Sequence, residues 1–209
     1  CCTPAAMQKL SRKLPSSRIR TTSTAATPWP SPAAGSVRRG DTVTVFPAGT
    51  TARVVEVRRA GERVEGACAG QSAGLVLDRQ IDVSRGDWLG NATALQPHDQ
   101  CWATLAWLDV EPAVVGRKYW LRHGHRWVQA RLGAIAERLD IHTLRPEPAT
   151  SLGVNELGTV CFELHQPLPL QPFEADRVGG ALIVVDPATH RTSGAALVAA
   201  GAPTAGHAA

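Results

Sequence analysis

Apolar residues along this chain alternate with polar ones over short stretches, which is the spacing of β-strands. In Thr42–Phe46, Val43 and Val45 share one face, and Val55 and Val57 share a face of the next strand, residues 53–57. A third strand of smaller residues is predicted over residues 70–77. No segment of residues 34–89 repeats every 3.6 residues. Over residues 133–144, Ile135 and Leu139 suggest a helix, but the alternation over residues 139–144 favours a strand, so we predict an all-β protein.

Gly- and Pro-containing turns separate these strands and shape residues 34–95 as one small antiparallel β-barrel. In Pro47–Thr50, the proline presets φ and Gly49 supplies a positive φ, and residues 60–62 form a second turn. Gly74 is expected where a strand bends or another strand approaches closely. The triplet Arg-Gly-Asp occurs at 39–41 and 85–87, each time as a turn into an apolar segment. Adhesion is therefore not the expected role of either triplet.

The second half of the chain predicts another β-barrel, residues 99–198. Its first strand, residues 101–110, places Trp102 and Leu108 on one face and Leu105 and Trp107 on the other, so we expect both faces to be covered. Further strands are predicted at 117–122, 126–132, 139–144, 158–164, 179–186 and 192–198, the run 179–186 being a buried strand and the last one closing the barrel. Residues 145–152 and 166–173 are predicted as loop, 91–98 as a linker between domains, and 199–209 as a tail.

Charge and composition set residues 1–33 apart from the rest. Residues 1–40 contain seven basic and no acidic residues, whereas residues 41–209 contain fifteen basic and eighteen acidic ones, a net charge of −3. The basic balance is therefore confined to the first part, and nucleic-acid binding is not expected of the folded part. Residues 1–33 are rich in Ser, Thr, Pro and Ala and lack periodicity, so we predict a disordered or aberrant segment in place of a first strand, leaving the first barrel incomplete. An organellar transit peptide is the alternative interpretation.

The five cysteines favour buried thiols rather than disulfides or a metal site. No Cys-x-x-Cys pair occurs, and the internal cysteines lie far apart in apolar segments. No apolar run approaches the roughly 18 residues needed to cross a bilayer. We therefore expect a cytoplasmic protein without a membrane partner.

Short motifs in a fixed order resemble one known family. The motifs are Arg39–Val45 with Pro47–Gly49, Ile81–Asp87, Trp107–Asp109 with Glu111–Pro112, Gly116–Tyr119, Leu152–Gly158, and the strand from Gly179 to Asp186. Over residues 34–198 this order resembles domains two and three of elongation-factor-Tu-type GTPases. More narrowly, it resembles the large, GTPase-type subunit of bacterial sulfate adenylyltransferase, which occurs alone or fused to adenylylsulfate kinase.

The resemblance implies a part of a GTP-driven enzyme of sulfate assimilation. In that family a separate small subunit transfers the adenylyl group of ATP to sulfate, and GTP hydrolysis in the large subunit drives the reaction. This sequence contains neither Gly-x-x-x-x-Gly-Lys-Ser/Thr nor Asn-Lys-x-Asp. The resemblance therefore implies a C-terminal barrel pair whose partners are the catalytic small subunit and a GTPase domain outside this chain, to which GTP and Mg²⁺ would belong.

We assign no catalytic, cofactor-binding or metal-binding residue in this chain. His123 and His125 flank a glycine but lack a third ligand, so a solvated hairpin tip is the favoured interpretation. Asp109 and Glu111 are interpreted as a solvated strand end, and Cys161 as a small core residue without an activating base. The remaining histidines considered, which are expected at the surface, are His98, His142, His165 and His190.

The cluster of tryptophans has two interpretations. Six of the ten aromatic residues are Trp, and four of them lie within 26 residues: Trp102, Trp107, Trp120 and Trp127. Most are expected in the core, and one or two on an outer face would mark a contact with the GTPase domain or the small subunit. A base-stacking platform for RNA, as in a translation factor, is the alternative. A nonfunctional remnant of the same gene is the third hypothesis.

Overall fold

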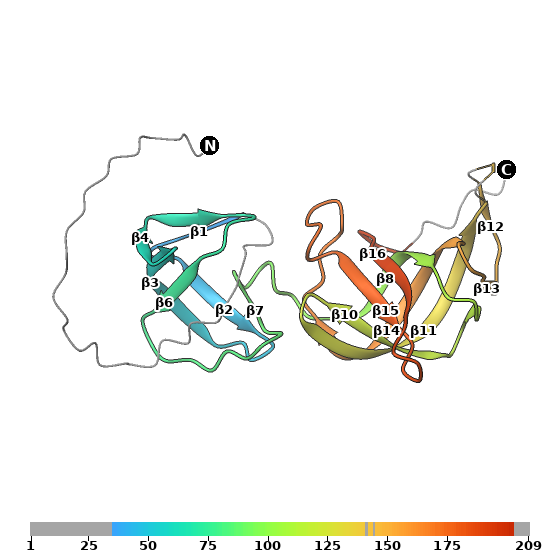
Figure 1. Ribbon diagram of the computed structural model, residues 1–209, viewed down its shortest axis with the longest axis horizontal. Coiled ribbons are helices and arrows are strands. Elements are labelled where there is room, and N and C mark those ends of the chain that lie inside the picture. The colour runs from blue at the N-terminus through green and yellow to red at the C-terminus, as the bar shows by residue number, and fades with distance from the viewer. Residues whose placement is uncertain (1–34, 141, 144, 203–209) are drawn as a thin grey trace.

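The computed structural model describes residues 35–140, 142–143 and 145–202, and these residues form strands and connections without a helix. Two groups of strands follow one another along the chain (Figure 1). We call Ser36–Gly90 the first unit and His98–Val198 the second barrel. The all-β prediction is confirmed, and residues 91–97 connect the two groups. With no helix among the described residues, none is present that could cross a membrane.

The first unit is an antiparallel sheet with a small two-stranded ribbon beside it. Its strands are β1 (Ser36–Arg38), β2 (Thr42–Phe46), β3 (Thr51–Arg59), β4 (Glu62–Val64), β5 (Gly66–Cys68), β6 (Gly74–Leu77) and β7 (Trp88–Gly90). The order is β4-β3-β2-β7, β6 also pairs with β3, and β1 pairs with β5. The pairings among the described residues leave this sheet open, with β2 as the one partner of β7 in that part of the chain. The prediction for residues 1–33 lies outside the described residues.

A β-bulge in β3 corrects the predicted side-chain pattern. The pairing of β3 with β6 shifts register between Val54 and Glu56. Because a one-residue insertion sends the following side chains to the opposite face, Val54 and Val57 are both buried while Val55 is 43% exposed. The alternation therefore predicted the strand but misplaced Val55.

Most turns of the first unit are as predicted. Gly49 has φ +70° after a cis Phe46–Pro47 bond, and both Arg-Gly-Asp triplets turn at a glycine with positive φ. In each triplet the aspartate side chain accepts a hydrogen bond from a preceding backbone N–H, that of Arg38 or Ser84. Gly74 begins β6, and a Cβ there would meet only ordinary contacts at 3.9 Å or more, so the close approach of another strand that was one alternative for this glycine is not present.

The second barrel is closed by six antiparallel strands. Its strands are β8 (His98–Trp107), β9 (Ala113–Val114), β10 (Lys118–His123), β11 (Arg126–Leu139), β12 (Pro146–Glu147), β13 (Ser151–Leu152), β14 (Leu157–Leu168), β15 (Ala181–Val185) and β16 (Thr192–Val198). The order β10-β15-β16-β8-β14-β11 closes because β10 also pairs with β11, and β12 extends the sheet from β11. As predicted, β16 seals the barrel between β15 and β8.

The core of the second barrel comes from one face of each strand. Leu105 and Trp107 of β8 are buried against Tyr119, Leu121 and Phe162. The prediction that both faces of β8 are covered is wrong: Trp102 lies half-buried on the other face, and Leu108, just beyond the strand, is 51% exposed. A closed single-layer barrel buries only the inward face of each strand, so the outward large residues keep solvent contact.

Two predicted segments of the second barrel differ in the structure. The strand predicted over residues 139–144 ends at Leu139, and Asp140 accepts hydrogen bonds from the backbone N–H of His142 and the hydroxyl of Thr143 to form a turn. Ile141 and Leu144 lie outside the described residues. Residues 145–152, predicted as loop, contain the short strands β12 and β13, and β14 continues to Leu168 through a register shift.

Gly180 is required where the loop before β15 folds back on itself. A Cβ at this buried glycine would lie 2.4 Å from Phe173 Cα and 2.7 Å from Gln171 O. Backbone atoms cannot move aside as a flexible side chain can, so Gly180→Ala should lower the free energy of unfolding by about 3 kcal/mol. Urea denaturation measures the loss. Gly201→Ala, where a Cβ meets nothing within 4 Å, is the control and should leave stability unchanged. Equal stability of the two variants would contradict the prediction.

Candidate functional site: the joint between the two units

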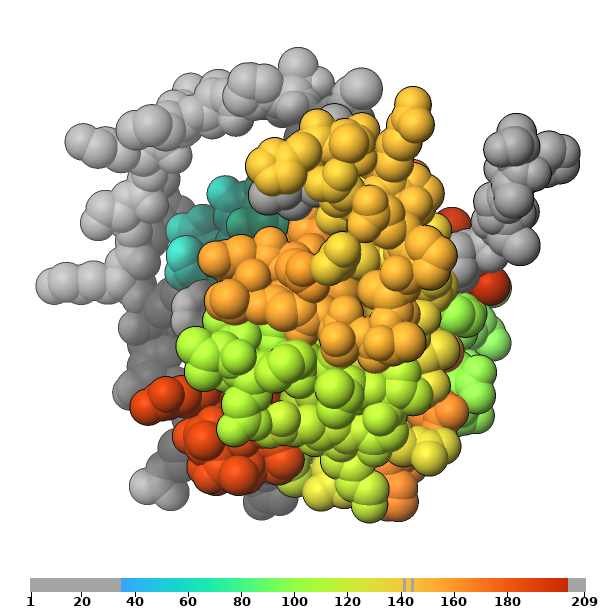
Figure 2. Space-filling model, turned by 90° about the vertical axis from the view of Figure 1, so that its right-hand side faces the viewer, coloured from blue at the N-terminus to red at the C-terminus, as the bar shows by residue number. Residues whose placement is uncertain are grey.

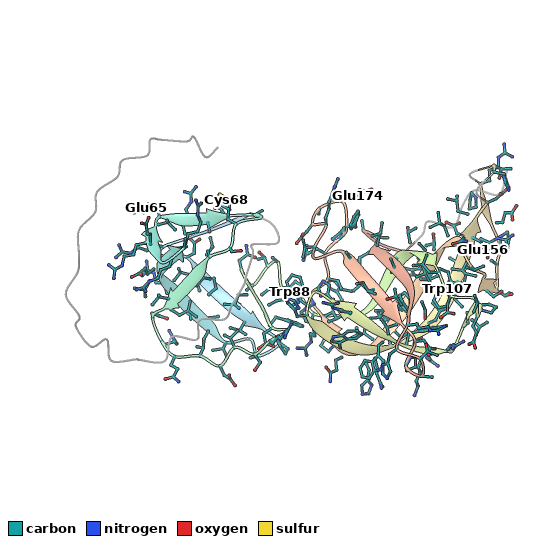
Figure 3. All side chains as sticks on the ribbon, in the orientation of Figure 1. Glu65, Cys68, Trp88, Trp107, Glu156 and Glu174 are labelled. Carbon is teal, nitrogen blue, oxygen red and sulfur yellow. The ribbon has the colours of Figure 1, made fainter. Side chains whose placement is uncertain are left out.

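Two turns, one from each unit, meet where the first unit contacts the second barrel. The first is the Arg85–Asp87 turn that leads into β7, and the second is the Gly124–His125 turn between β10 and β11. A Cβ at Gly86 would lie 3.4 Å from His125 O, and a Cβ at Gly124 would lie 3.1 Å from Trp88 Cζ2. Glycine at both positions therefore allows the two backbones to approach closely. We call this contact the joint; Trp88 is labelled there in Figure 3.

Trp88 and His123 form the centre of the joint. Their rings are stacked, with centroids 4.4 Å apart and planes inclined by 15°. His123 is completely buried, and its Nε2 is 2.9 Å from the carbonyl oxygen of Gly179, which precedes β15. One side chain thus contacts β7 of the first unit and the loop before β15 of the second barrel.

Charged groups surround this stack. Arg126 Nη1 lies 3.7 Å from Asp87 Oδ1, and both side chains are largely buried. Arg126 Nε and His123 Nδ1 are buried without a hydrogen-bond partner among the described residues. Gln171 Nε2 also donates to Ala94 O, which ties the linker to the second barrel.

The histidines considered in the sequence analysis differ in their exposure to solvent. His125 is exposed as expected, and so are His98, His142, His165 and His190. The interpretation of His123 as part of a solvated hairpin tip is wrong, because Trp88 covers it. Burial lowers the pKa of His123 to about 4, partly opposed by the hydrogen bond to Gly179 and the negative charge of Asp176.

Trp88 is the residue of the joint that the sequence did not single out. It follows the second Arg-Gly-Asp triplet, which was interpreted only as a turn. The available signal was a large aromatic residue directly after a Gly-containing turn, in a unit with few aromatic residues. Its partner lies 35 positions away, so local patterns could not indicate the stack.

The carboxylates of Asp109 and Glu111 lie at the opposite end of the second barrel and serve separate contacts. Figure 2 faces this end, where the segment after β8 lies beside those following β13 and β15. Asp109 accepts a hydrogen bond from the Ser193 hydroxyl, which lowers the Asp109 pKa. Glu111 pairs with Arg117, whose other nitrogen contacts Asp186 at 2.7 Å. This arrangement does not support acid–base catalysis by the two carboxylates as a pair.

The Gly-rich segment between β13 and β14 does not fit a nucleotide phosphate. The backbone N–H of Gly153 donates to the Glu156 carboxylate at 2.7 Å, so a negative charge already occupies the position that a phosphate would need. In the described part of the chain, no group of three His, Cys, Asp or Glu side chains could hold a metal ion. Cys161 is buried as predicted, and burial raises its pKa; burial also raises the pKa of Cys101 to about 12.

The clustered tryptophans occupy three different environments. Trp107 is fully buried, Trp102 and Trp120 are half-buried, and Trp127 is 48% exposed with the Arg122 guanidinium 5.7 Å from its ring centroid. The expectation that most of them belong to the core is therefore wrong, and Trp127 is the most exposed of the four.

Gly124→Ala should weaken the joint. The residue has φ +58°, and the new Cβ would press against the Trp88 ring. Gly116→Ala is a matched control, because Gly116 also has a positive φ, +88°, but open space around it. We expect Gly116→Ala to cost about 1 kcal/mol of backbone strain and Gly124→Ala about 1 kcal/mol more. Urea unfolding of both variants checks this, and equal losses would exclude a tight contact with Trp88.

Comparison with known proteins adds the relatives of this fold. Residues 100–199 match the family model described as GTP-eEF1A C-terminal domain-like. Sulfate adenylyltransferase subunit 1 of Laribacter hongkongensis is 34% identical over 176 residues, which cover 83% of this chain and 37% of the relative. The bifunctional enzyme CysN/CysC of Xylella fastidiosa is 39% identical over 171 residues, 81% of this chain and 27% of the relative. The chain thus spans 37% of the length of the first relative and 27% of the second.

Solved structures share the fold at low sequence identity. The crystal structure of Sup35 with GDP superposes with a TM-score of 0.70 and 20% identity, covering 79% of this chain and 41% of Sup35. Elongation factor SelB from Methanococcus maripaludis gives a TM-score of 0.61 and 22% identity, covering 79% of this chain and 37% of SelB.

The fold is that of an elongation-factor-type pair of β modules. This follows from the closed second barrel, the sheet unit before it and the match to the family model. Within that class, the identity of 34–39% over about four fifths of the chain points to sulfate adenylyltransferase subunit 1 and its fused form. The chain is a relative of sulfate adenylyltransferase subunit 1, and it matches only part of that protein's length.

Proposed function

We propose that these β modules serve a sulfate adenylyltransferase by holding a separate catalytic subunit and a GTPase domain in a fixed relation. The observation that carries the proposal is the identity shared with sulfate adenylyltransferase subunit 1 across both the first unit and the second barrel. In this proposal the catalytic subunit transfers the adenylyl group of ATP to sulfate. GTP and Mg²⁺ belong to the GTPase domain, and no residue of this chain is assigned to them.

The geometry supports a mechanical rather than a chemical role. The joint links the two units through a ring stack and a largely buried ion pair, so a displacement of one unit would carry the other with it. Nucleotide-dependent movement of the GTPase domain could then reach the catalytic subunit through a stiff pair of β modules. The Glu156 carboxylate, which accepts a hydrogen bond from the Gly153 N–H in the segment between β13 and β14, argues against phosphate binding at that segment.

Complex formation with a catalytic subunit tests the proposal. The full 209-residue chain is mixed at neutral pH with the small, catalytic subunit that accompanies a close family member, and the mixture is analysed by size-exclusion chromatography with light scattering. We expect a stable complex of the two chains. A chain whose circular dichroism shows folded β-structure but which elutes separately from the subunit at micromolar concentration would refute the proposal.

An RNA-binding assay separates this role from that of a translation factor. The net charge of −3 over residues 41–209 predicts no salt-dependent shift of an RNA stem-loop in a gel. A shift that weakens steeply with salt would instead favour the RNA-binding alternative.

A further inference from the structure

His123 occupies a position that only the neutral form of its ring satisfies. The Gly179 carbonyl can only accept a hydrogen bond, so Nε2 carries the proton and Nδ1 is the bare acceptor. Nδ1 is buried and has no partner among the described residues. Protonation would therefore create a second N–H donor, and a positive charge, where no acceptor is present.

Charged and titratable groups flank His123 on each element that packs against it. On β10 Arg122 Nε donates a hydrogen bond to Gly124 O, and the Arg122 guanidinium lies over the Trp127 ring rather than over His123. On β11 Arg126 is directed to Asp87 of the first unit. The groups of this neighbourhood are Arg122, His125, Arg126, Asp87 and Asp176. Asp176, in the loop before β15, attracts a proton onto His123, but burial outweighs that attraction.

We propose that His123 is an acid-released lock that holds the first unit against the second barrel. The neutral ring stacks on Trp88, whereas the protonated ring must reach water to be solvated. Gly179 O can accept from Nε2 in both protonation states, so the contact that gives way is the one with Trp88. Attraction between an imidazolium and the face of Trp88 opposes the release, but it is smaller than the cost of burying an unpaired cation. This inference does not depend on which partner the β modules bind.

The pH range of the release follows from the two states of His123. In the closed joint its pKa is about 4, and in an opened joint the pKa returns toward the ordinary 6.5. A depressed pKa means that the closed state is fully favoured above pH 6.5 and is lost as pH falls toward 4. The ratio of closed to open joint should drop about tenfold for each pH unit in that window, and at most about three hundredfold in total.

Nuclear magnetic resonance of the full chain tests the lock. The indole N–H signal of Trp88, assigned with Trp88→Phe, and the ring signals of His123 are followed from pH 7.5 to 4. Small-angle scattering follows the separation of the two units over the same range. We expect the Trp88 signal to change with a midpoint between pH 4 and 6.5 while the radius of gyration rises and the β-structure remains.

Three variants decide the outcome. His123→Phe keeps an aromatic ring on Trp88 but cannot take up a proton, so its Trp88 signal should no longer depend on pH. His125→Gln changes the exposed histidine of the same turn and should behave as the unmodified chain. In Trp88→Ala the pKa of His123 should rise from about 4 toward 6.5. A pH response that persists in His123→Phe, or a His123 pKa that is unchanged in Trp88→Ala, would overturn the proposal.

Discussion

Replacing Trp107 with alanine should lower the free energy of unfolding of the second barrel by about 4 kcal/mol. The side chain is 1% exposed and meets the Tyr119 ring edge-on, with centroids 5.5 Å apart. Its indole N–H donates to the Glu111 carbonyl at 2.8 Å, so truncation removes both a large apolar volume and the donor that holds the loop after β8. Urea denaturation followed by circular dichroism measures the loss.

Trp127→Ala is the matched control for this experiment. The same residue type is removed from the same barrel, but Trp127 is 48% exposed on the outer face of β11. We expect a loss of no more than about 1 kcal/mol from its contact with Arg122. Similar losses in the two variants would show that the barrel interior is not formed as the structure describes.

Asp186→Ala should cost about 3 kcal/mol, because the Asp186 carboxylate organises the turn between β15 and β16. It is 3% exposed and accepts from the backbone N–H groups of Ala188 and Thr189 while pairing with Arg117. Alanine would leave these donors without their acceptor in a largely buried site. Thermal and urea unfolding measure the effect, and Asp99→Ala, at an exposed position of β8, should be neutral.

The pH dependence of the Asp186 effect has a defined sign. The backbone N–H of Thr189 and the other donors hold the pKa of Asp186 below its ordinary value. A carboxyl with a lowered folded pKa stabilises above its unfolded pKa of about 4 and loses that contribution at lower pH. The stability difference between the unmodified chain and Asp186→Ala should therefore be constant from pH 8 to 5 and shrink below pH 4. A difference that grows on acidification would contradict this assignment.

The two ends of the second barrel have different physical characters. At one end the joint combines a neutral stacked histidine with buried polar atoms that have no partner within the part of the chain that the structure describes, an arrangement that protonation can disturb. At the other end Trp107, Arg117 and Asp186 are paired in a network whose charges satisfy one another. We therefore expect acidification to act first at the joint and only at lower pH on the opposite end.

The sequence by itself determined the class of fold and most of the strands. Alternation of period two, with Gly and Pro at the reversals, fixes which residues can be extended and which must turn, because these preferences are local. The strands β2, β10, β15 and β16 and the positive φ of Gly49 and Gly124 follow from such local rules. The absence of helix in the described residues follows from them as well.

Only the tertiary structure decided which faces are buried and what the joint is made of. A single bulge in β3 placed Val57 on the buried face and Val55 on the exposed one, and closure of the second barrel left Trp127 outside while Trp107 filled the core. His123 looked like the polar tip of a hairpin until β7, from the other unit, covered it with Trp88. Burial depends on what distant segments place against a side chain, and a pattern of neighbours along the chain does not contain that information.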